Sequence, residues 1–290
     1  MQTSTTLKEK ASGVIQLFRP ELPLAAGMCV VIGELLALGA IPPLKAVGLG
    51  FACGFFLAGS ALITNDYFDL EVDRINAPQR PLPAGRLSRP EVMTLGIGTA
   101  LAGLAAAWVF SPLALGLSLI VWLMGFLYNW KLKAAGLWGN LIVSASVAIT
   151  FILGGIVVGQ PWNRTVWVFG LIAGFFDLAE EIAGDAMDAE GDQKRASQSI
   201  AIVRGKQTAL RISGGLFGLV VVLSFLPIGW GELGLRYLLT ISLTDMLIIF
   251  FAIKLLRSQT PAEGRRSMRG LYLSGSLGLL GFLLGSFLAA

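Results

Sequence analysis

Two short segments of the chain carry aspartates at the same spacing. Each set contains three aspartates, separated by three and then by four residues. The two sets are Asp66, Asp69 and Asp73, and Asp185, Asp188 and Asp192. Side chains at positions i, i+3 and i+7 lie on one face of an α-helix. We therefore expect each segment to present three carboxylates from a single helical stripe.

Carboxylates grouped in this way suit a hard divalent cation. Mg²⁺ prefers oxygen ligands and commonly joins protein carboxylates to the oxygens of a phosphate. Arg74 and Arg80 follow the first set, Lys194 follows the second, and Lys131 and Lys133 end an apolar segment between them. Acids alone would indicate a cation site. Acids accompanied by several basic residues indicate a metal site that also binds a diphosphate.

Few other residues offer chemistry. The chain has no histidine, which excludes the commonest general base. Its two cysteines, Cys29 and Cys53, lie in apolar runs, and neither spacing nor context indicates a disulfide or a metal site. Glu34 and Asp245 lie alone within apolar segments, where an acid is either functional or simply hydrogen-bonded. We assign no role to either.

The composition is that of a polytopic membrane protein. Of the 290 residues, 55% are hydrophobic and 14% are charged, whereas a soluble domain carries about 25% charged residues. Nine apolar segments reach the length of about 20 residues that a helix needs to cross a bilayer. They are approximately 20–40, 46–68, 91–110, 113–131, 138–158, 165–187, 208–227, 233–256 and 269–288. We expect an all-α fold in a single transmembrane domain over residues 1–290. The patterns Gly50-x-x-x-Gly54 and Gly214-x-x-x-Gly218 would let its helices pack closely.

The basic residues predict the orientation of this domain. With nine crossings, the loops on the side of the N-terminus contain 19 of the 22 Lys and Arg residues. The positive-inside rule then places the N-terminus in the cytoplasm and the C-terminus outside. Both acidic segments, and the long loops at about 69–90 and 188–207, face the cytoplasm. We therefore expect a multi-pass protein of the cell membrane whose functional loops and active site face the cytoplasm.

The motif residues are also familiar as a set. Asn65-Asp66-x-x-Asp69-x-x-x-Asp73, followed by Arg80-Pro81-Leu82-Pro83-Ala84-Gly85, resembles the first signature of the UbiA superfamily of intramembrane prenyltransferases, and Asp188-x-x-x-Asp192 with Lys194 resembles the second. The helix count, the places of the motifs and the chain length fit as well, so the resemblance covers essentially the whole chain. It implies nine transmembrane helices around a central cavity. It also implies Mg²⁺-dependent transfer of a polyprenyl group from its diphosphate to an acceptor, with two metal ions.

The resemblance implies roles for individual residues. Asn65, Asp66, Asp69 and Asp73 would bind one Mg²⁺–diphosphate unit, and Asp185, Asp188 and Asp192 would bind the second, with Asp66, Asp69, Asp73, Asp188 and Asp192 as the catalytic set. The residues implied to contact substrate are Arg19, Asn65, Arg74, Arg80, Tyr128, Lys131, Lys133 and Lys194. Aromatic faces such as that of Tyr128 would shelter an allylic cation from water. The expected partners are the prenyl diphosphate, a lipid or aromatic acceptor and membrane lipids, without nucleic acid.

Within the superfamily, the chain looks most like the archaeal branch that transfers geranylgeranyl groups to geranylgeranylglyceryl phosphate. Residues 127–133 and 181–192 carry this similarity. The branch often has an Arg and a Lys where this chain has Glu180 and Gly184. An acceptor that carries a phosphate should favour more positive charge there. Transfer to an aromatic acceptor, such as 4-hydroxybenzoate or a quinone precursor, therefore stays open as the alternative.

Two other classes of membrane protein also group acids. A cation-coupled transporter would place them near the bilayer midplane on broken helices, whereas both sets here lie at predicted helix ends. A transferase of the CDP-alcohol type would hold its acids in one extended motif, whereas four predicted helices separate the two sets in this chain. Both classes fit the spacing less well than a prenyltransferase.

Overall fold

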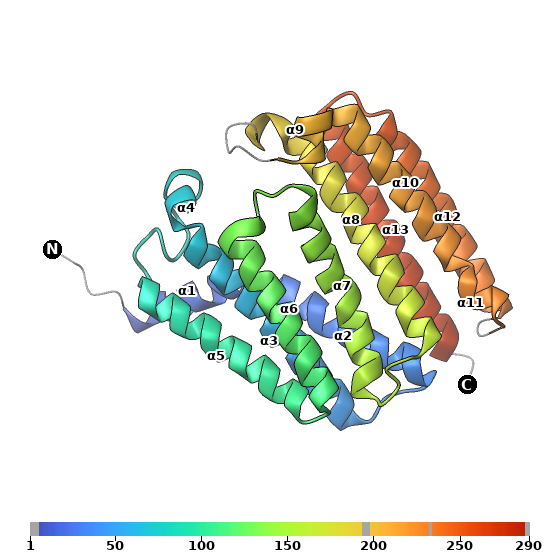
Figure 1. The fold of residues 1–290 in the computed structure, drawn as a ribbon, viewed down its shortest axis with the longest axis horizontal. Helices are drawn as coiled ribbons and strands as arrows, with labels where there is room; N and C mark the ends of the chain where they lie inside the picture. Colours follow the sequence, from blue (N-terminus) through green and yellow to red (C-terminus); the bar gives the residue numbers. More distant parts are fainter. Residues whose placement is uncertain (1–5, 193–197, 232–233, 288–290) are drawn as a thin grey trace. The chain divides into compact units, whose positions relative to one another are not determined.

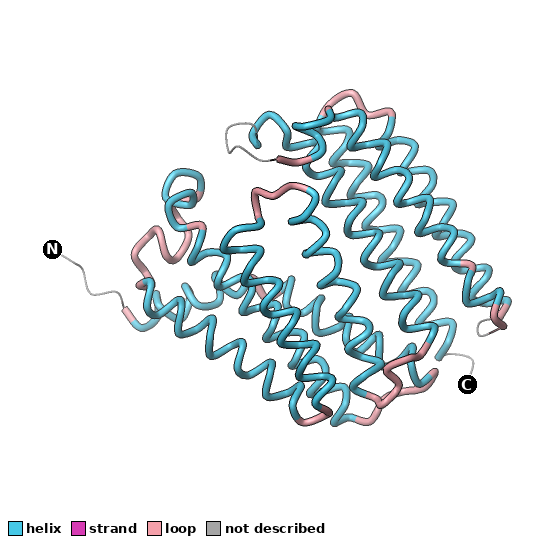
Figure 2. The backbone as a smooth tube through the Cα atoms, viewed as in Figure 1, coloured by secondary structure: helices cyan, strands magenta, loops and turns pink. Residues whose placement is uncertain are grey.

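The computed structural model is built of helices and loops, and the part of the chain that it describes contains no strand (Figure 2). It describes residues 6–192, 198–231 and 234–287, with the side chains of 190–192 and 281–287 outside the description. The expectation of an all-α fold is confirmed. Figure 1 labels the helices in chain order.

The described helices have the following bounds. They are α1 (Leu7–Phe18), α2 (Glu21–Leu38), α3 (Leu44–Phe68), α4 (Leu70–Asn76), α5 (Arg89–Trp108), α6 (Pro112–Leu127), the π-helix η1 (Tyr128–Leu132), α7 (Leu137–Val157), α8 (Arg164–Asp192), α9 (Ile200–Arg204), α10 (Lys206–Ser224), α11 (Leu226–Gly229), α12 (Leu235–Leu256) and α13 (Pro261–Phe287). Each predicted apolar segment corresponds to one long helix, with α11 continuing the segment that begins in α10.

Seven of the long helices in the described chain are long and apolar enough to cross a membrane. They are α2, α3, α5, α6 with η1, α7, α10 with α11, and α12. α8 differs because Asp177, Glu180 and Glu181 lie in its interior. α13 carries arginines in its first turns, and its last residues lack a described side chain. Nine membrane crossings are therefore not confirmed, and crossings by α8 and α13 stay predictions.

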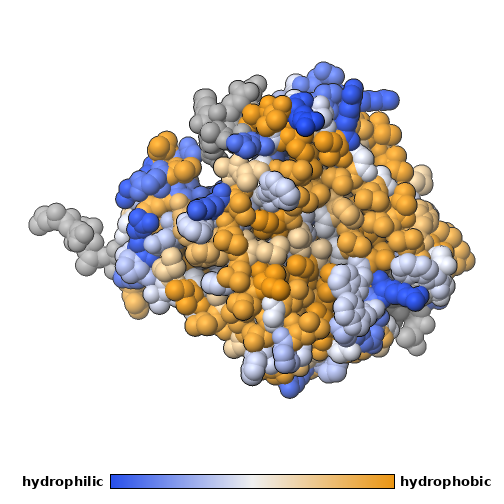
Figure 3. Space-filling view, in the orientation of Figure 1, coloured by the Kyte–Doolittle hydropathy of each residue, from blue (hydrophilic) through white to orange (hydrophobic). Residues whose placement is uncertain are grey.

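The exposed surface over the long helices is largely hydrophobic, and hydrophilic residues gather near helix ends (Figure 3). On α12, Leu239, Leu243 and Met246 form a stripe in which each residue is more than 60% exposed. Positions i, i+4 and i+7 share a helix face. A face of this kind would be costly in water and fits the acyl chains of a bilayer. The protein is a multi-pass membrane protein.

The chain forms two compact units. The first contains residues 1–130 and 149–161, and the second contains residues 131–148 and 162–290. α7 contributes its beginning to the second unit and its end to the first. Each unit has a hydrophobic core of its own. Val30, Cys53, Leu57 and Ile152 belong to the first core, and Ile182, Leu210, Phe217 and Leu255 belong to the second.

A smaller apolar cluster in the first unit joins the segments around the first set of aspartates. It contains Leu17 of α1, Ile63 of α3, Leu70 of α4, the loop residues Leu82 and Leu87, and Val92 of α5. All six side chains are at most 6% exposed. Burial of large apolar side chains stabilises a fold by about 1.5–3 kcal/mol each. The cluster therefore fixes the end of α3, the short α4 and the loop that follows it.

Glycines let helices of the first unit approach closely. A Cβ added at Gly54 of α3 would lie 2.8 Å from a backbone oxygen of α2, and one added at Gly154 of α7 would lie 2.1 Å from the carbonyl oxygen of Val30. The pattern that contains Gly54 thus predicts a real close contact. In the second pattern the prediction is wrong for Gly218, because no atom lies within 4 Å of its added Cβ.

Gly154→Ala is expected to lower the free energy of unfolding by about 1–3 kcal/mol, because the added methyl group would collide with a backbone oxygen that cannot rotate away. Gly218→Ala is the matched control, since its methyl group meets open space and alanine favours a helix over glycine. The measurement is thermal unfolding of both variants in detergent. Equal melting temperatures would contradict the close contact between α2 and α7.

Candidate functional site

The first set of aspartates lies where α3 ends and α4 begins. Asp66 is in the last turn of α3, Asp69 separates the two helices, and Asp73 lies in α4. The predicted single helical stripe is therefore wrong in detail, because the helix is interrupted at Asp69. Asp is a weak helix former whose side chain competes for backbone hydrogen bonds, so an interruption at this residue is physically reasonable. The backbone still continues in register, since the amide of Asp73 donates to the carbonyl of Asp69 at 2.8 Å.

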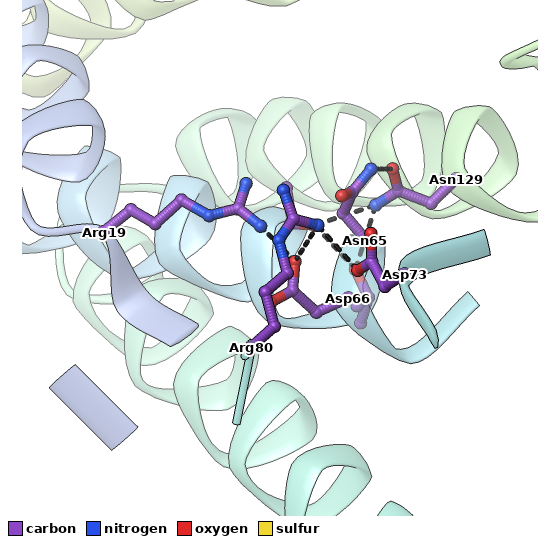
Figure 4. Close-up of polar contacts among 8 residues, drawn as sticks. Arg19, Asn65, Asp66, Asp73, Arg80 and Asn129 are labelled. Atoms are coloured by element: carbon purple, nitrogen blue, oxygen red, sulfur yellow. Dashed lines mark hydrogen bonds and ion pairs between the residues drawn. The ribbon is translucent and has the colours of Figure 1, made fainter. Parts of the chain in front are cut away.

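Asp66 and Asp73 converge on the guanidinium of Arg80 (Figure 4). Nη1 of Arg80 lies 2.6 Å from Oδ2 of Asp73 and 3.5 Å from Oδ1 of Asp66. Both aspartates are at most 5% exposed. Burial disfavours the charge of Arg80, but the hydrogen bond to Asp73 and the charges of the nearby aspartates outweigh burial, so the pKa of Arg80 is raised above its ordinary value. Arg80 therefore stays cationic.

Arg19 reaches the same carboxylate from another element. Its guanidinium forms an ion pair with Asp66 (Figure 4). Arg19 ends α1 in the left-handed region with φ 43° and ψ 65°, the one described non-glycine residue with a positive φ. Such a conformation costs about 1 kcal/mol or more in a residue with a Cβ, and Pro20 after it narrows the choice further. The local strain is compatible with a functional position, because it directs a charged side chain toward Asp66.

Asn65 is held by a residue to which our sequence analysis gave no role. Nδ2 of Asn65 donates to Oδ1 of Asn129 at 3.2 Å, and Nδ2 of Asn129 donates to Oγ1 of Thr64 at 3.1 Å and to the carbonyl of Ala61 at 2.8 Å (Figure 4). Asn129 is 8% exposed. With the Asn65 amide nitrogen directed toward Asn129, the carbonyl oxygen of Asn65 points to the other side. In the sequence, the one sign of this role was that Asn129 carries an amide within an apolar segment, because a buried amide needs a hydrogen-bond partner.

Asn129 occupies the π-helix η1, which follows α6. π-helical turns are rare and occur mostly near functional sites, because the additional residue in the turn changes the direction of the side chains. Tyr128 begins this turn and is partly buried. The turn therefore places an amide against α3 where a regular helix would direct a different side chain.

Aromatic side chains continue from the acidic segment into the unit. Tyr67 contacts Phe68, Phe68 contacts Phe126, and Phe126 contacts Trp122, with ring centroids 5.4–5.8 Å apart. Edge-to-face and tilted ring pairs of this kind stabilise packing and present aromatic faces. Aromatic rings are thus packed next to the first acidic segment, and their role in sheltering an allylic cation stays a prediction. Arg74 is exposed and pairs with Glu71 of its own helix at 2.9 Å.

The donor set of the first segment fits a hard cation. Carboxylate oxygens of Asp66 and Asp73 meet at one guanidinium nitrogen, which shows that two buried carboxylates can share a single positive centre. Asp69 and the oxygen of Asn65 are neighbouring oxygen donors of the kind that Mg²⁺ prefers. Within residues 6–192, 198–231 and 234–287, no group of three or more acidic, Cys or His side chains is gathered as a metal site. Binding of Mg²⁺ by three of these acids would thus require their side chains to come closer together.

The second set of aspartates lies on α8, which continues unbroken to Asp192. Asp185 accepts from Nδ2 of Asn140 on α7 at 2.9 Å. Asp188 forms an ion pair with Arg265 on α13. The side chain of Asp192 and the whole of Lys194 lie outside the described residues. The expected helix is thus confirmed, whereas the convergence of the three carboxylates is not tested.

Further acids of α8 lie deeper in its apolar part. Asp177 accepts from Oγ of Ser144 on α7 at 2.8 Å, and Glu180 and Glu181 are partly buried. Asp177 and Ser144, like Asn140, were not assigned from the sequence, because an isolated polar residue in an apolar helix gives no indication of its partner. Lys131 and Lys133 are exposed at the connection between η1 and α7.

Comparison with known proteins gives one consistent result. The model of the UbiA prenyltransferase family matches residues 26–288. A digeranylgeranylglyceryl phosphate synthase from Thermococcus kodakarensis is 34% identical over 273 residues, which cover 94% of this chain and 97% of that protein. A protein of the same name from Methanopyrus kandleri is 34% identical over 269 residues, which cover 93% and 97%.

Solved structures agree with the fold. The structure of a digeranylgeranylglyceryl phosphate synthase in membranes has a TM-score of 0.85 at 29% identity, covering 96% of this chain and 99% of that one. A UbiA homologue from Archaeoglobus fulgidus, solved with DMAPP and Mg²⁺, has a TM-score of 0.65 at 20% identity, covering 94% and 99%.

Asn129→Ala is expected to weaken binding of a divalent cation about ten-fold, because residues that orient metal ligands typically contribute this much to affinity. Mn²⁺ in the presence of inorganic diphosphate is the probe, titrated into purified protein and followed by electron paramagnetic resonance. Ser60→Ala is the control, since the Ser60 hydroxyl on α3 donates to the carbonyl of Gly96 at 2.8 Å and accepts from Nε1 of Trp122 at 3.2 Å. The substitution removes both bonds without touching Asn65. Wild-type affinity in Asn129→Ala, or equal losses in both variants, would contradict the positioning role.

Proposed function

The chain belongs to the UbiA prenyltransferase family, and from this premise we propose that it transfers a geranylgeranyl group from its diphosphate to geranylgeranylglyceryl phosphate in archaeal ether-lipid synthesis. One observation carries the proposal. Relatives named digeranylgeranylglyceryl phosphate synthase are up to 34% identical over nearly the full length of both chains. The protein is a prenyltransferase, and the transporter and CDP-alcohol alternatives do not fit this family.

The proposed reaction exchanges one carbon–oxygen bond for another. The bond between the allylic carbon and the diphosphate oxygen breaks, and its electron pair leaves with the diphosphate. The hydroxyl oxygen of the acceptor then forms a bond to the allylic carbon and loses its proton. Because the chain has no histidine, a carboxylate of the acidic segments or the released diphosphate accepts that proton. The aromatic faces around Phe68 and Phe126 would stabilise positive charge on the allylic carbon.

Mg²⁺, when bound, would neutralise charge that develops on the departing diphosphate. We infer that two ions are held, one by Asn65, Asp66, Asp69 and Asp73 and the other by Asp185, Asp188 and Asp192. A UbiA homologue has been solved with Mg²⁺ and a prenyl diphosphate, which supports magnesium as the metal. The shared contact of Asp66 and Asp73 with one cationic nitrogen supports the first of these sites.

The arginines of the first segment would change partners during binding. Arg19 and Arg80 are paired with the same carboxylates that would ligate the metal. A guanidinium displaced from a carboxylate stays in reach of a diphosphate and can bind it through two parallel N–H donors. We therefore assign Arg19 and Arg80 to the diphosphate. Arg74, Tyr128, Lys131, Lys133 and Lys194 are proposed as further substrate contacts on the basis of the family resemblance.

The orientation inferred from the basic residues completes the proposal. Nine crossings would place the N-terminus in the cytoplasm and the C-terminus outside the cell membrane. Both acidic segments would then face the cytoplasm, where a water-soluble cation and the diphosphate group are available. Around the long helices, the hydrophobic surface would give the prenyl chains of donor and acceptor access from the lipid.

Purified protein is expected to transfer radiolabelled geranylgeranyl diphosphate to geranylgeranylglyceryl phosphate in the presence of Mg²⁺ and to stop when EDTA is added. A parallel reaction offers 4-hydroxybenzoate as the acceptor. The reason is that α8 has Glu180 and Gly184 where the archaeal branch that the chain resembles often has an arginine and a lysine. Product with the glycerol phosphate alone supports the proposal. Product with the aromatic acid alone would replace it with an aromatic prenyltransferase.

Asp69→Ala and Asp188→Ala are each expected to lower turnover at least 100-fold, because each would remove a carboxylate that holds a metal in the transition state. Glu71→Ala is the matched control, since Glu71 is an exposed acid two residues from Asp69 that pairs with the exposed Arg74. Turnover is measured at saturating Mg²⁺, with melting temperatures to verify folding. Near-normal turnover in either aspartate variant would remove that residue from the site.

A further inference from the structure

Arg265 of α13 contacts the second acidic segment. Nη2 of Arg265 forms an ion pair with Oδ1 of Asp188 on α8. About half of each side chain is exposed, 53% for Arg265 and 49% for Asp188. The ion pair joins the basic first turns of α13 to an acid of α8. Our sequence analysis treated Arg265 simply as one of the basic residues that determine orientation.

The attachment of α13 to α8 does not require this ion pair. A Cβ added at Gly264 would lie 2.1 Å from the sulfur of Met187, so the two helices are in direct contact next to Arg265. Leu271 of α13 belongs to the same buried core as Ile182 and Ala186 of α8. Exposed ion pairs contribute little to stability, whereas buried apolar contacts contribute more. Arg265 is thus available for a role other than packing.

The chemistry of a guanidinium fits a phosphate group. It carries five N–H donors in a planar fork, and the contact with Asp188 uses Nη2. The fork matches two oxygens of a phosphate and binds them with charge-assisted hydrogen bonds. Because half of the side chain is exposed, an anion can approach it without displacing α13.

Gly184 of α8, next to Asp185, faces the same helix. A Cβ added at Gly184 would lie 3.8 Å from the terminal methyl of Met268 on α13. Met268 lies one helical turn after Arg265. Arg265 thus lies one turn from the residue of α13 that approaches the start of the second aspartate set.

We propose that Arg265 binds the phosphate of the acceptor and thereby selects a phosphorylated acceptor over one without a phosphate. The inference rests on the proposed function, since it requires an acceptor that carries a phosphate. The same guanidinium chemistry would suit the diphosphate of the donor. Experiments with and without the acceptor phosphate distinguish these two sources.

The test compares wild type, Arg265→Ala and Arg265→Lys with two acceptors, geranylgeranylglyceryl phosphate and geranylgeranylglycerol. Arg265→Ala is expected to lower kcat/KM for the phosphorylated acceptor by about 10- to 100-fold, through a higher KM, because a hydrogen-bonded charge pair of this kind is lost. For the acceptor without a phosphate, kcat/KM should change less than about two-fold. For the phosphorylated acceptor, kcat/KM of Arg265→Lys should lie between the values of wild type and Arg265→Ala, since lysine keeps the charge and loses the fork of N–H donors.

Arg266→Ala is the matched control, because it removes the same charge one residue further along the exposed part of α13. This variant should keep the wild-type kcat/KM for both acceptors. Equal losses for both acceptors in Arg265→Ala would overturn the inference in favour of a structural role at Asp188. A rise in the KM of the donor would assign the phosphate contact to the diphosphate instead. Wild type that fails to use the phosphorylated acceptor would refute the proposed function itself, and that result does not depend on any Arg265 variant.

Discussion

The buried carboxylates where α3 ends and α4 begins constrain where several segments of the first unit lie. Asp66 and Asp73 are nearly inaccessible to solvent, and buried ionised groups are tolerated only when charge partners and hydrogen bonds compensate for lost hydration. Arg80 and Arg19 provide that compensation from a loop and from the end of α1. The apolar cluster around Leu17, Leu70 and Leu82 then fixes these segments close enough for the arginines to reach.

The acids of the two segments find their partners in different ways. In the first, the helix is interrupted at Asp69, and the cations come from sequence positions close to the motif or from α1. In the second, α8 stays continuous, and its acids find partners on the neighbouring helices α7 and α13. α8 contains a single basic residue, Arg164 at its start, so the partners of its acids come from other helices. This difference explains why Asn140, Ser144 and Arg265 were not recognised as one set with α8.

The arginines of such a site hold the carboxylates in place and can also exchange one anionic partner for another. An arginine that balances the charge of buried carboxylates in the absence of a metal must move away from them when a divalent cation binds there. Arg19, Arg80 and Arg265 each place a guanidinium group against a carboxylate of one of the two aspartate sets. Each guanidinium can turn from a carboxylate to a phosphate without leaving its element, because both anions accept the same fork of N–H donors. Side chains of this kind suit a prenyltransferase, which must bind the diphosphate of its donor.

The sequence by itself determined the class of this protein. Periodic apolar segments, the low charge content and the two aspartate sets were sufficient for an all-α membrane protein and for the UbiA family, because these features depend on local composition and spacing. Residues such as Asp66, Asp69 and Arg80 were identifiable for the same reason. The tertiary structure decided which side chains meet. The contact of Asn129 with Asn65 and the pairing of Arg265 with Asp188 both depend on segments brought together by packing. No local pattern specifies such contacts, since each partner lies tens of residues from the acid or amide it contacts.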